Sequence, residues 1–305
     1  MKALFFTGKG GVGKSTLAAA AAWQLSERGF KVLAVSFDPA HNLGDIYNLQ
    51  LGHKKKKFTK NLYLQEADLD KAASAYIAQN IDILNEVYSY TRAFNMDLYF
   101  KVLRYSPGVE EYASLTIMEE IFRSETGFDY LVFDTPPTGL TLRILALPNI
   151  TVTWIDRLRR IRKQILEKRY TIHNISGQYI EKGVRLAYQE EDDRVIKKLD
   201  ELWKRYAGVY KILKSDNTKL CVVFNPDYLS LRESQRIITG FKDLQLGLHV
   251  AYNNKYQDSL SDVAQEVEQR LLNGTTGVDL VRVPMHDYVR ESAYAFDFDV
   301  TAPFR

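Results

Sequence analysis

Short uninterrupted hydrophobic runs recur along the chain, at residues 3–6, 32–37, 130–133, 220–224, 248–252 and 278–283. These runs do not alternate with polar residues, which is typical of strands buried on both faces of a parallel sheet. An alanine-rich segment over residues 15–28 separates the first two runs and stops at Gly29, as a helix with a C-terminal glycine does. The pattern predicts an N-terminal βαβ unit within an α/β fold whose sheet is doubly wound and mostly parallel.

Two longer segments between these runs, at about residues 70–125 and 153–215, carry helical periodicity. The second contains apolar residues at steps of three and four, at Val195, Ile196, Leu199, Leu202, Trp203, Tyr206, Val209, Ile212 and Leu213. An arginine-rich helix before it has Ile155, Leu158, Ile161 and Ile165 on one face. We predict a single domain over residues 1–305 with a helical subdomain inserted twice. Its core comprises residues 1–69, 126–152 and 216–305.

The composition is that of a folded globular protein, because 46% of the residues are hydrophobic and 26% are charged. The net charge of +3 is too small to imply nucleic-acid binding, and none is expected. No stretch approaches the ~18 apolar residues of a transmembrane helix, so no integral membrane segment is expected. The single cysteine, Cys221, excludes an intrachain disulfide or Cys-x-x-Cys zinc site, favours a cytoplasmic location, and is expected to be buried and inert.

A glycine-rich loop follows the first predicted strand and opens the first predicted helix. Its residues fit the pattern G-x-x-x-x-G-K-[ST] and are Gly8, Lys9, Gly10, Gly11, Val12, Gly13, Lys14 and Ser15. Glycines let main-chain N–H groups approach phosphate oxygens closely, and the helix N-terminus favours an anion. The loop, together with Thr16, is therefore predicted to bind ATP. Lys14 would neutralise the β- and γ-phosphates, and Ser15 would hold Mg²⁺.

The second lysine of the loop, Lys9, adds a more specific feature. With it the loop resembles the deviant Walker A loop of the signal-recognition/MinD-like branch of P-loop ATPases. The resemblance implies that Lys9 crosses a dimer interface and stabilises transition-state charge on the nucleotide of the partner subunit. The alternative is an exposed lysine without a catalytic role.

Acidic segments follow two of the predicted strands. The first is Asp38-Pro39-Ala40-His41-Asn42-Leu43-Gly44-Asp45, and the second begins Asp134-Thr135-Pro136-Pro137-Thr138-Gly139. Ligands of open α/β sheets bind at the carboxyl ends of strands, where acidic residues can serve Mg²⁺ or an attacking water. A lone aspartate at such a place can equally form a turn or cap a helix.

These segments resemble switch I (D-P-A-H-[NS]-L-[SG]-D) and switch II (D-T-A-P-T-G-H-T-L-R) of the arsenical pump-driving and tail-anchored-protein-targeting ATPases. The resemblance implies that Asp45 positions the attacking water and that Asp134 binds Mg²⁺ through water. The other switch residues that it implies are Asp38, Pro39, His41, Asn42, Pro137, Thr138 and Gly139. By similarity to the family's adenine-side segment and base loop, Asn253 and Pro284 would contact the nucleotide, and residues 107–111 match its P-G-x-x-E segment.

The family resemblance implies a cytoplasmic homodimer that couples ATP hydrolysis to opening and closing of its helical subdomain. Its partner would be a hydrophobic client segment or a membrane porter, and the alternative is a client-maturation or partition-type ATPase without a transport role. The chain departs from the family at Pro136 and Leu140, which replace Ala and His in switch II. It also lacks the family's zinc-binding Cys pair and three-thiol metalloid site, and it contains only 4 methionines.

Three further features of the sequence remain open to two interpretations each. An aromatic, apolar stretch over residues 88–105 is either a client groove or packing between inserted helices. The four-lysine run at residues 54–57 is either a solvated loop or a binding surface for acidic groups or lipid headgroups. The arginine-rich helix near Ile155 is either an exposed face or a grip for anionic partners.

Overall fold

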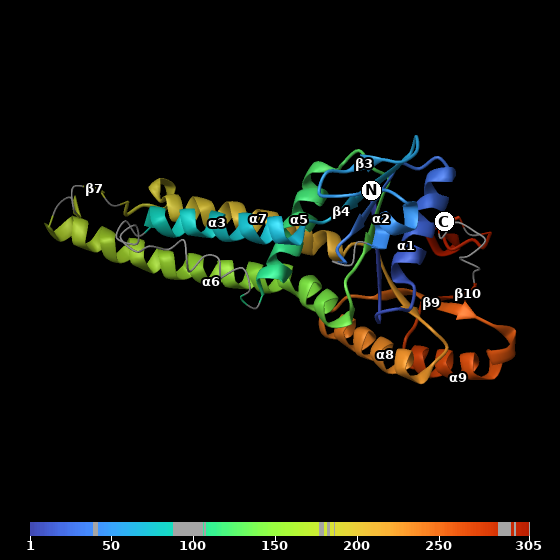
Figure 1. Cartoon of the computed structure of the whole chain (residues 1–305). Coiled ribbons are helices and arrows are strands. Elements are labelled where there is room, and N and C mark those ends of the chain that lie inside the picture. Colours follow the sequence, from blue (N-terminus) through green and yellow to red (C-terminus); the bar gives the residue numbers. More distant parts are fainter. Residues whose placement is uncertain are drawn as a thin grey trace. The chain divides into compact units, whose positions relative to one another are not determined.

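The computed structural model describes residues 1–38, 42–87, 106, 108–176, 180–181, 184–185, 187–285, 294–295 and 297–304 (Figure 1). It divides into two compact units. The larger comprises Met1–Leu145 and Leu213–Arg305, and the smaller is Ala146–Ile212. No helix in the described part of the chain is long and apolar enough to cross a membrane.

An eight-stranded sheet forms the centre of the larger unit, in the order β10-β9-β8-β1-β5-β2-β4-β3. Its strands are β1 (Lys2–Gly8), β2 (Val32–Ser36), β3 (Lys56–Lys57), β4 (Leu62–Glu66), β5 (Tyr130–Asp134), β8 (Thr218–Phe224), β9 (Leu248–Tyr256) and β10 (Asp279–Pro284). Every neighbouring pair is parallel except β3 with β4. The predicted fold class is confirmed. The hydrophobic pattern did not predict β4, which ends in Gln65 and Glu66, or β3, which consists of two lysines.

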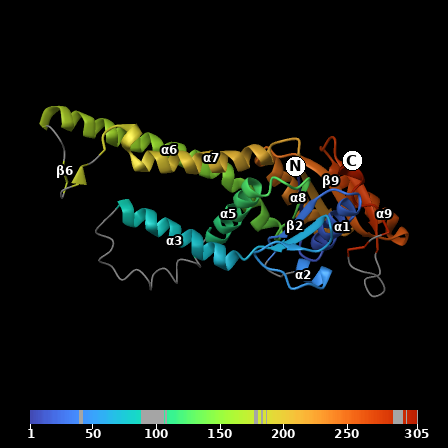
Figure 2. The same ribbon diagram turned by 90° about the horizontal axis from the view of Figure 1, so that it is seen from above.

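Helices cover both faces of this sheet, as a doubly wound fold requires. They are α1 (Lys14–Glu27), α2 (Asn42–Tyr47), α5 (Val109–Ser124), the start of α6 (Thr138–Ser176), α8 (Tyr228–Asp243) and α9 (Ser261–Leu272). Helix α3 (Leu69–Val87) follows β4 and packs against α5. On one face α1 packs over Leu4 and Phe6 and lies beside α2 (Figures 1 and 2). On the other face, the rings of Phe5 and Phe133 stack with their centroids 4.6 Å apart. Phe122 of α5 packs edge-on against the ring of Phe133.

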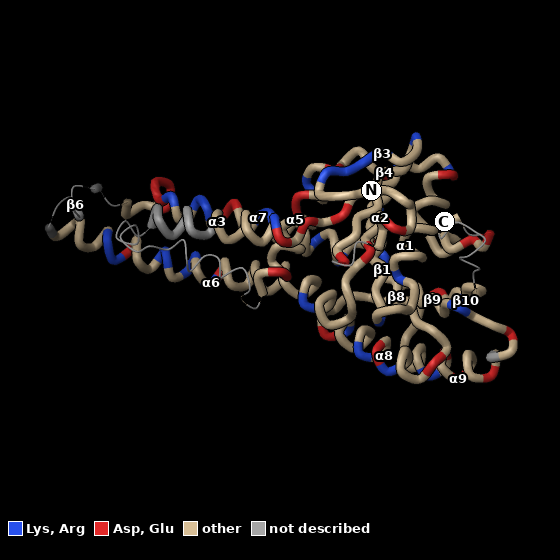
Figure 3. Tube along the Cα trace, viewed as in Figure 1, with Lys and Arg blue, Asp and Glu red and all other residues tan. Residues whose placement is uncertain are grey.

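The four-lysine run lies at the edge of the sheet. Lys56 and Lys57 form the short edge strand β3, visible as a blue stretch in Figure 3, and Lys55 pairs with Glu125 at 2.5 Å. Charged side chains on an edge strand discourage pairing with another chain. This placement accounts for Lys56 and Lys57, and a binding role for the four-lysine run stays a prediction.

The smaller unit pairs the rest of α6 with α7 (Arg194–Leu213), and contains the short strands β6 (Ile180–Glu181) and β7 (Val184–Arg185). Asp193 accepts two hydrogen bonds from Arg162, at 3.1 and 2.7 Å. Lys163 pairs with Glu190 at 2.8 Å. Part of the basic face of α6 is therefore engaged with acidic side chains inside this unit.

Most of the apolar face of α6 is exposed. Ile155 is only 5% exposed, but Leu158, Ile161 and Ile165 are 46%, 50% and 38% exposed. The residue that packs inward instead is Leu166, at 2% exposure. Ion pairs therefore lie on one side of α6, and its apolar stripe is exposed.

The first predicted insertion contains α3 and α5, which belong to the larger unit, where the rings of Tyr76 and Tyr112 stack. The aromatic stretch at residues 88–105 and Pro107 of the P-G-x-x-E match lie outside the described residues. That the two insertions act as one subdomain stays a prediction.

Candidate functional site

The glycine-rich loop connects β1 to α1 and passes close to the ends of two neighbouring strands. Gly13 has a left-handed backbone, with φ of 94°, and a Cβ there would collide with the amide of Asn254. A Cβ at Gly8 would collide with the main-chain oxygen of Val223 on β8. Close approach therefore requires glycine at both positions.

Lys14, at the start of α1, is only 5% exposed. Its ammonium donates a 3.4 Å hydrogen bond to the main-chain oxygen of Lys9, so the side chain curls back across the loop. A buried ammonium is costly unless an anion compensates it. The position fits a site that receives phosphate. Lys9 itself is half-buried, and Ser15 and Thr16 follow Lys14 in the first turn.

Asp134, at the end of β5, is 1% exposed and lies near Ser15 and Lys14. Burial raises the pKa of its carboxyl to about 6, and the negative charge of Asp38 also raises it. Hydrogen bonds from Ser15 and Ser36 and the positive charge of Lys14 lower the pKa but do not outweigh burial. One carboxyl oxygen, Oδ2, accepts a 3.2 Å hydrogen bond from Ser36. The other, Oδ1, is buried and has no hydrogen-bond partner within the described structure.

This donor set fits Mg²⁺. The ion prefers oxygen ligands and is commonly held by one or two carboxylates together with substrate phosphates and water. Asp134 Oδ1 is a buried acceptor without a partner among the described residues, and the Ser15 hydroxyl interacts with the same carboxyl. In the described residues no group of three or more His, Cys, Asp or Glu side chains could hold a metal by itself.

Switch I leads from β2 into α2. Asp38 is half-buried, Asp45 is exposed in the first turn of α2, and Pro39, Ala40 and His41 lie outside the described residues. Tyr47 anchors the helix, since its hydroxyl donates a 2.8 Å hydrogen bond to the main-chain oxygen of Ala19. Asn42 begins this short helix. Asp45 is thus presented to solvent from an anchored helix.

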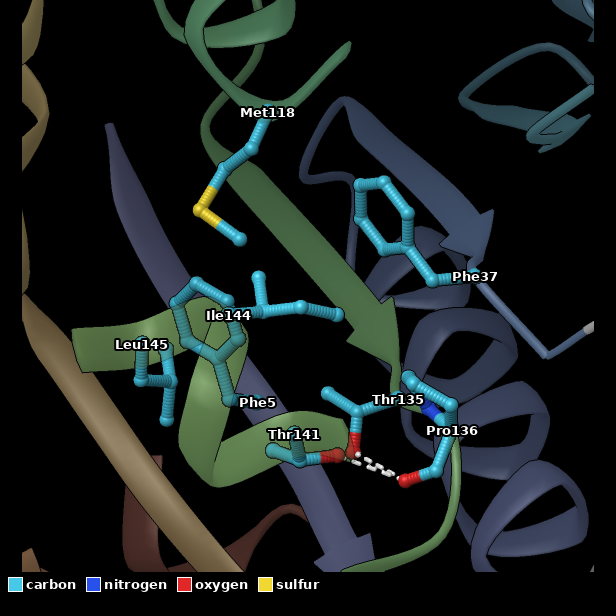
Figure 4. Close-up of a pocket in the computed structure, with 8 residues that line it drawn as sticks. All are labelled: Phe5, Phe37, Met118, Thr135, Pro136, Thr141, Ile144 and Leu145. Carbon is cyan, nitrogen blue, oxygen red and sulfur yellow. Dashed lines mark hydrogen bonds between the residues drawn. The ribbon is translucent and has the colours of Figure 1, made fainter. Parts of the chain in front are cut away.

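Switch II leads from β5 into α6. The Pro136 carbonyl oxygen accepts hydrogen bonds from Thr141 at 2.6 Å and Thr135 at 3.4 Å. Thr138 is buried, whereas Pro137 and Gly139 are exposed. Beneath the turn lies a small, mostly apolar cavity, into which eight side chains point (Figure 4). It is lined by Phe5, Phe37, Met118, Thr135, Pro136, Thr141, Ile144 and Leu145, and does not involve the glycine loop.

The end of β9 contacts the glycine loop through residues that the sequence analysis did not select. Asn254 donates a 2.7 Å hydrogen bond to the main-chain oxygen of Val12, and Lys255 donates one of 3.2 Å to that of Gly11. Asn253 is fully buried and points to the other side of the strand, where its amide donates to Glu268 at 2.7 Å. Its Oδ1 is left without a partner among the described residues, so a contact with adenine stays a prediction. Pro284 is exposed at the end of β10.

Asn254 was missed because a polar residue in a strand gives no sign of which loop it reaches. Ser36 was missed for the same reason, although its hydroxyl contacts Asp134. Cys221 is buried as expected, and burial raises the pKa of its thiol above the ordinary value.

A glycine loop between a parallel strand and a helix, with its lysine buried and an aspartate on the neighbouring strand, defines an α/β P-loop NTPase. A family model described as anion-transporting ATPase matches residues 1–278. The chain belongs to this family and is an ATPase, which confirms the resemblance seen in its motifs.

Relatives with assigned names agree with this family. A protein of Prosthecochloris vibrioformis, provisionally named an arsenical pump-driving ATPase, is 32% identical over 305 residues, covering 94% of this chain and 71% of the relative. A similarly named protein of Aquifex aeolicus is 28% identical over 307 residues, covering 97% and 96%. ATPase get3 of Pyrenophora tritici-repentis is 28% identical over 252 residues, covering 81% and 71%.

Proposed function

We propose that this ATPase is a cytoplasmic, Mg²⁺-dependent homodimer that couples ATP hydrolysis to opening and closing of its helical segments. The observation that carries the proposal is the buried, unpartnered Oδ1 of Asp134 beside Ser15 and Lys14. A buried acceptor next to a serine hydroxyl and a buried ammonium suits a cation bound together with phosphate.

Each residue has a separate task in this proposal. Lys14 and the loop N–H groups bind the phosphates, and Ser15 and Asp134 hold Mg²⁺, which when bound neutralises charge on the phosphate oxygens. Asp45 orients a water that attacks the γ-phosphorus, so that the bond to the bridging oxygen breaks and ADP and phosphate leave. Asp38 and Thr138 border the γ-phosphate side. Lys9 reaches the nucleotide of the partner subunit.

The role of Lys9 between subunits makes a complementation prediction. Lys9→Ala alone is expected to bind ATP with near-normal affinity but to hydrolyse it about 10³-fold more slowly, because charge in the transition state is no longer stabilised. Asp45→Asn alone is expected to bind ATP and hydrolyse it slowly. Mixed, the two variants should regain part of the wild-type turnover, since one site per mixed dimer then combines an intact Asp45 with the partner's intact Lys9.

Turnover of the mixture is measured by phosphate release at increasing ratios of the two proteins. If Lys9 acts within its own chain, the mixture stays as inactive as its components. Wild-type turnover in Lys9→Ala alone would rule out any catalytic role for this lysine.

The exposed apolar side chains of α6 favour a hydrophobic client over a metalloid anion. Trp154 is 60% exposed, and Leu158, Ile161, Ile165, Ile172 and Ile175 continue at helical spacing with exposures of 38% to 79%. Contiguous exposed apolar surface commonly marks an interaction site. The only cysteine, Cys221, is buried, so one chain cannot offer the thiols that the arsenite-responsive members use.

A defined peptide tests this client role. Asp45→Asn protein is incubated with ATP and a photo-crosslinking peptide that contains one transmembrane segment. Crosslinking is expected, and Ile161→Glu in the same background should reduce it about tenfold, because a charge disrupts the apolar stripe. Asn174→Glu, at an exposed polar position of the same helix, is the matched control and should leave crosslinking unchanged. Equal crosslinking in all three proteins, or none, would shift the proposal to a pump subunit or a maturation factor.

A further inference from the structure

Glu66 is a buried carboxylate in direct contact with switch I. It is the last residue of β4 and is 5% exposed. Its Oε1 accepts a 2.8 Å hydrogen bond from the main-chain N–H of Gly44 in α2. Gly44 immediately precedes Asp45, the residue proposed to orient the attacking water.

The chain encloses Gly44 tightly. A Cβ on Gly44 would lie 2.7 Å from the main-chain oxygen of Leu49 and 3.2 Å from Glu66 Oε1. Tyr47 anchors the end of this six-residue helix, and Glu66 contacts it at Gly44, beside Asp45. The hydrogen bond from the Gly44 N–H to Glu66 restrains the backbone immediately before Asp45.

The residues that follow Glu66 connect the same point to two other elements. The N–H of Ala67 donates a 2.9 Å hydrogen bond to the main-chain oxygen of Ser36, whose hydroxyl contacts Asp134. Asp68 accepts a 2.9 Å hydrogen bond from the N–H of Lys71 in the first turn of α3. Three successive residues therefore touch switch I, the strand beside the cation site, and the helix that begins the first insertion.

We propose that Glu66 is the positioning residue of switch I: its carboxylate holds the Gly44 N–H so that Asp45 is aligned for hydrolysis, and it joins switch I to the start of α3. This inference rests on the proposed role of Asp45. Glu66 does not contact the reacting atoms and acts through the α2 backbone.

Three substitutions separate positioning from a merely structural role. Glu66→Ala removes the acceptor, Glu66→Asp retracts it by one methylene, and Glu66→Gln keeps an oxygen at the same reach. Glu120→Ala, an exposed glutamate on α5, is the control. Glu66→Ala and Glu66→Asp are expected to lower kcat for ATP about 10²-fold with KM changed less than about twofold, because misplacement of a catalytic group costs rate while the phosphate loop is intact. The kcat of Glu66→Gln should stay within about threefold of the wild-type value, and the kcat of Glu120→Ala should equal the wild-type value.

Hydrogen exchange gives a readout that does not depend on hydrolysis. In nucleotide-free protein, amides of residues 42–47 and of the first turn of α3 are expected to exchange about tenfold faster in Glu66→Ala than in wild type. Glu66→Gln should restore most of the protection. If Glu66→Ala does not fold, the comparison of Glu66→Asp with Glu66→Gln carries the test.

The two proposals can fail separately. If Asp45→Asn hydrolyses ATP as fast as wild type, Asp45 does not have the proposed role. The exchange experiment would still test whether Glu66 restrains α2. Wild-type exchange and kcat in Glu66→Ala, or equal losses in the Gln and Asp variants, would overturn the positioning role. A rise in KM that accounts for the whole loss would also overturn it.

Discussion

Replacing Lys14 with alanine is expected to abolish ATP binding, lowering the affinity by at least about 10²-fold. The ammonium is buried and curled across the phosphate loop, so its removal would leave buried phosphate charge without its main counter-charge. Loss of one partner of a buried charge pair typically costs about 2–5 kcal/mol. Calorimetric titration with MgATP measures the change directly.

Lys255→Ala is the matched control for this experiment. Its side chain touches the same loop, at the main-chain oxygen of Gly11, but lies in the exposed part of the site. The affinity of this variant is expected to change less than about threefold, as for other exposed charges. Near-normal affinity in Lys14→Ala, or an equal loss in both variants, would show that Lys14 does not bind the phosphates.

Replacing Asp134 with asparagine is expected to have opposite effects on stability and on turnover. Burial raises the pKa of this carboxyl from 3.8 to about 6. Above pH 6 it is ionised in both the folded and the unfolded chain, and the folded chain bears a cost of about 3 kcal/mol. Below about pH 4 it is protonated in both states and the cost disappears. The nucleotide-free Asn variant should therefore be up to about 3 kcal/mol more stable than wild type at pH 8 and equally stable below pH 4.

Urea unfolding of nucleotide-free protein at both pH values measures this difference, and phosphate release measures turnover. Turnover of Asp134→Asn is expected to be lost, because a neutral amide is a poor ligand for a Mg²⁺ ion. A variant that is less stable than wild type at pH 8, or that hydrolyses ATP normally, would contradict the assignment.

Asp193→Asn is a control that is expected to change the stability at pH 8 in the opposite direction. Burial tends to raise the pKa of Asp193, but hydrogen bonds from Arg162 and the Ile196 N–H outweigh it and hold the pKa below the ordinary value. A lowered carboxyl pKa contributes stability that is present at neutral pH and is lost as the pH falls through the folded value. Asp193→Asn is therefore expected to destabilise the protein at pH 8, where Asp134→Asn stabilises it.

The parts of the site that sequence predicted best are those whose chemistry depends on adjacent residues. The glycine loop requires neighbouring residues of defined type, and its predicted strand and helix are confirmed as β1 and α1. The two acidic segments follow β2 and β5 as expected. Spacing along the chain was sufficient to locate the glycine loop and the acidic segments, because each lies between the end of a strand and the start of a helix.

Contacts between distant segments could not be predicted in the same way. Glu66 lies 22 residues beyond Gly44, on a strand that the hydrophobic pattern did not reveal, and Asn254 lies 242 residues from Val12. A polar residue near a strand end looks the same in sequence whether it meets solvent or a main-chain group. The order of strands in the sheet decides which of these happens.

Helix α6 shows the same limit for hydrophobic residues. Its spacing correctly indicated an amphipathic helix, but not which side would be covered. Ion pairs such as Arg162 with Asp193 place part of the basic side inside the smaller unit and leave Leu158 and Ile161 exposed. Spacing determines which residues share a face, whereas burial depends on the complementary side chains that another segment brings to it.

By itself, the sequence determined the α/β class, the phosphate loop and the family, because these depend on hydrophobic periodicity and on short motifs in which each residue acts through its neighbours. Only the tertiary structure decided that Asp134 is a buried carboxylate with an unused oxygen, that Glu66 accepts a hydrogen bond from Gly44, and that α6 exposes its apolar stripe. Each of these depends on how closely segments far apart in the chain approach one another, since proximity and exclusion of water set the strength of a charge or a hydrogen bond.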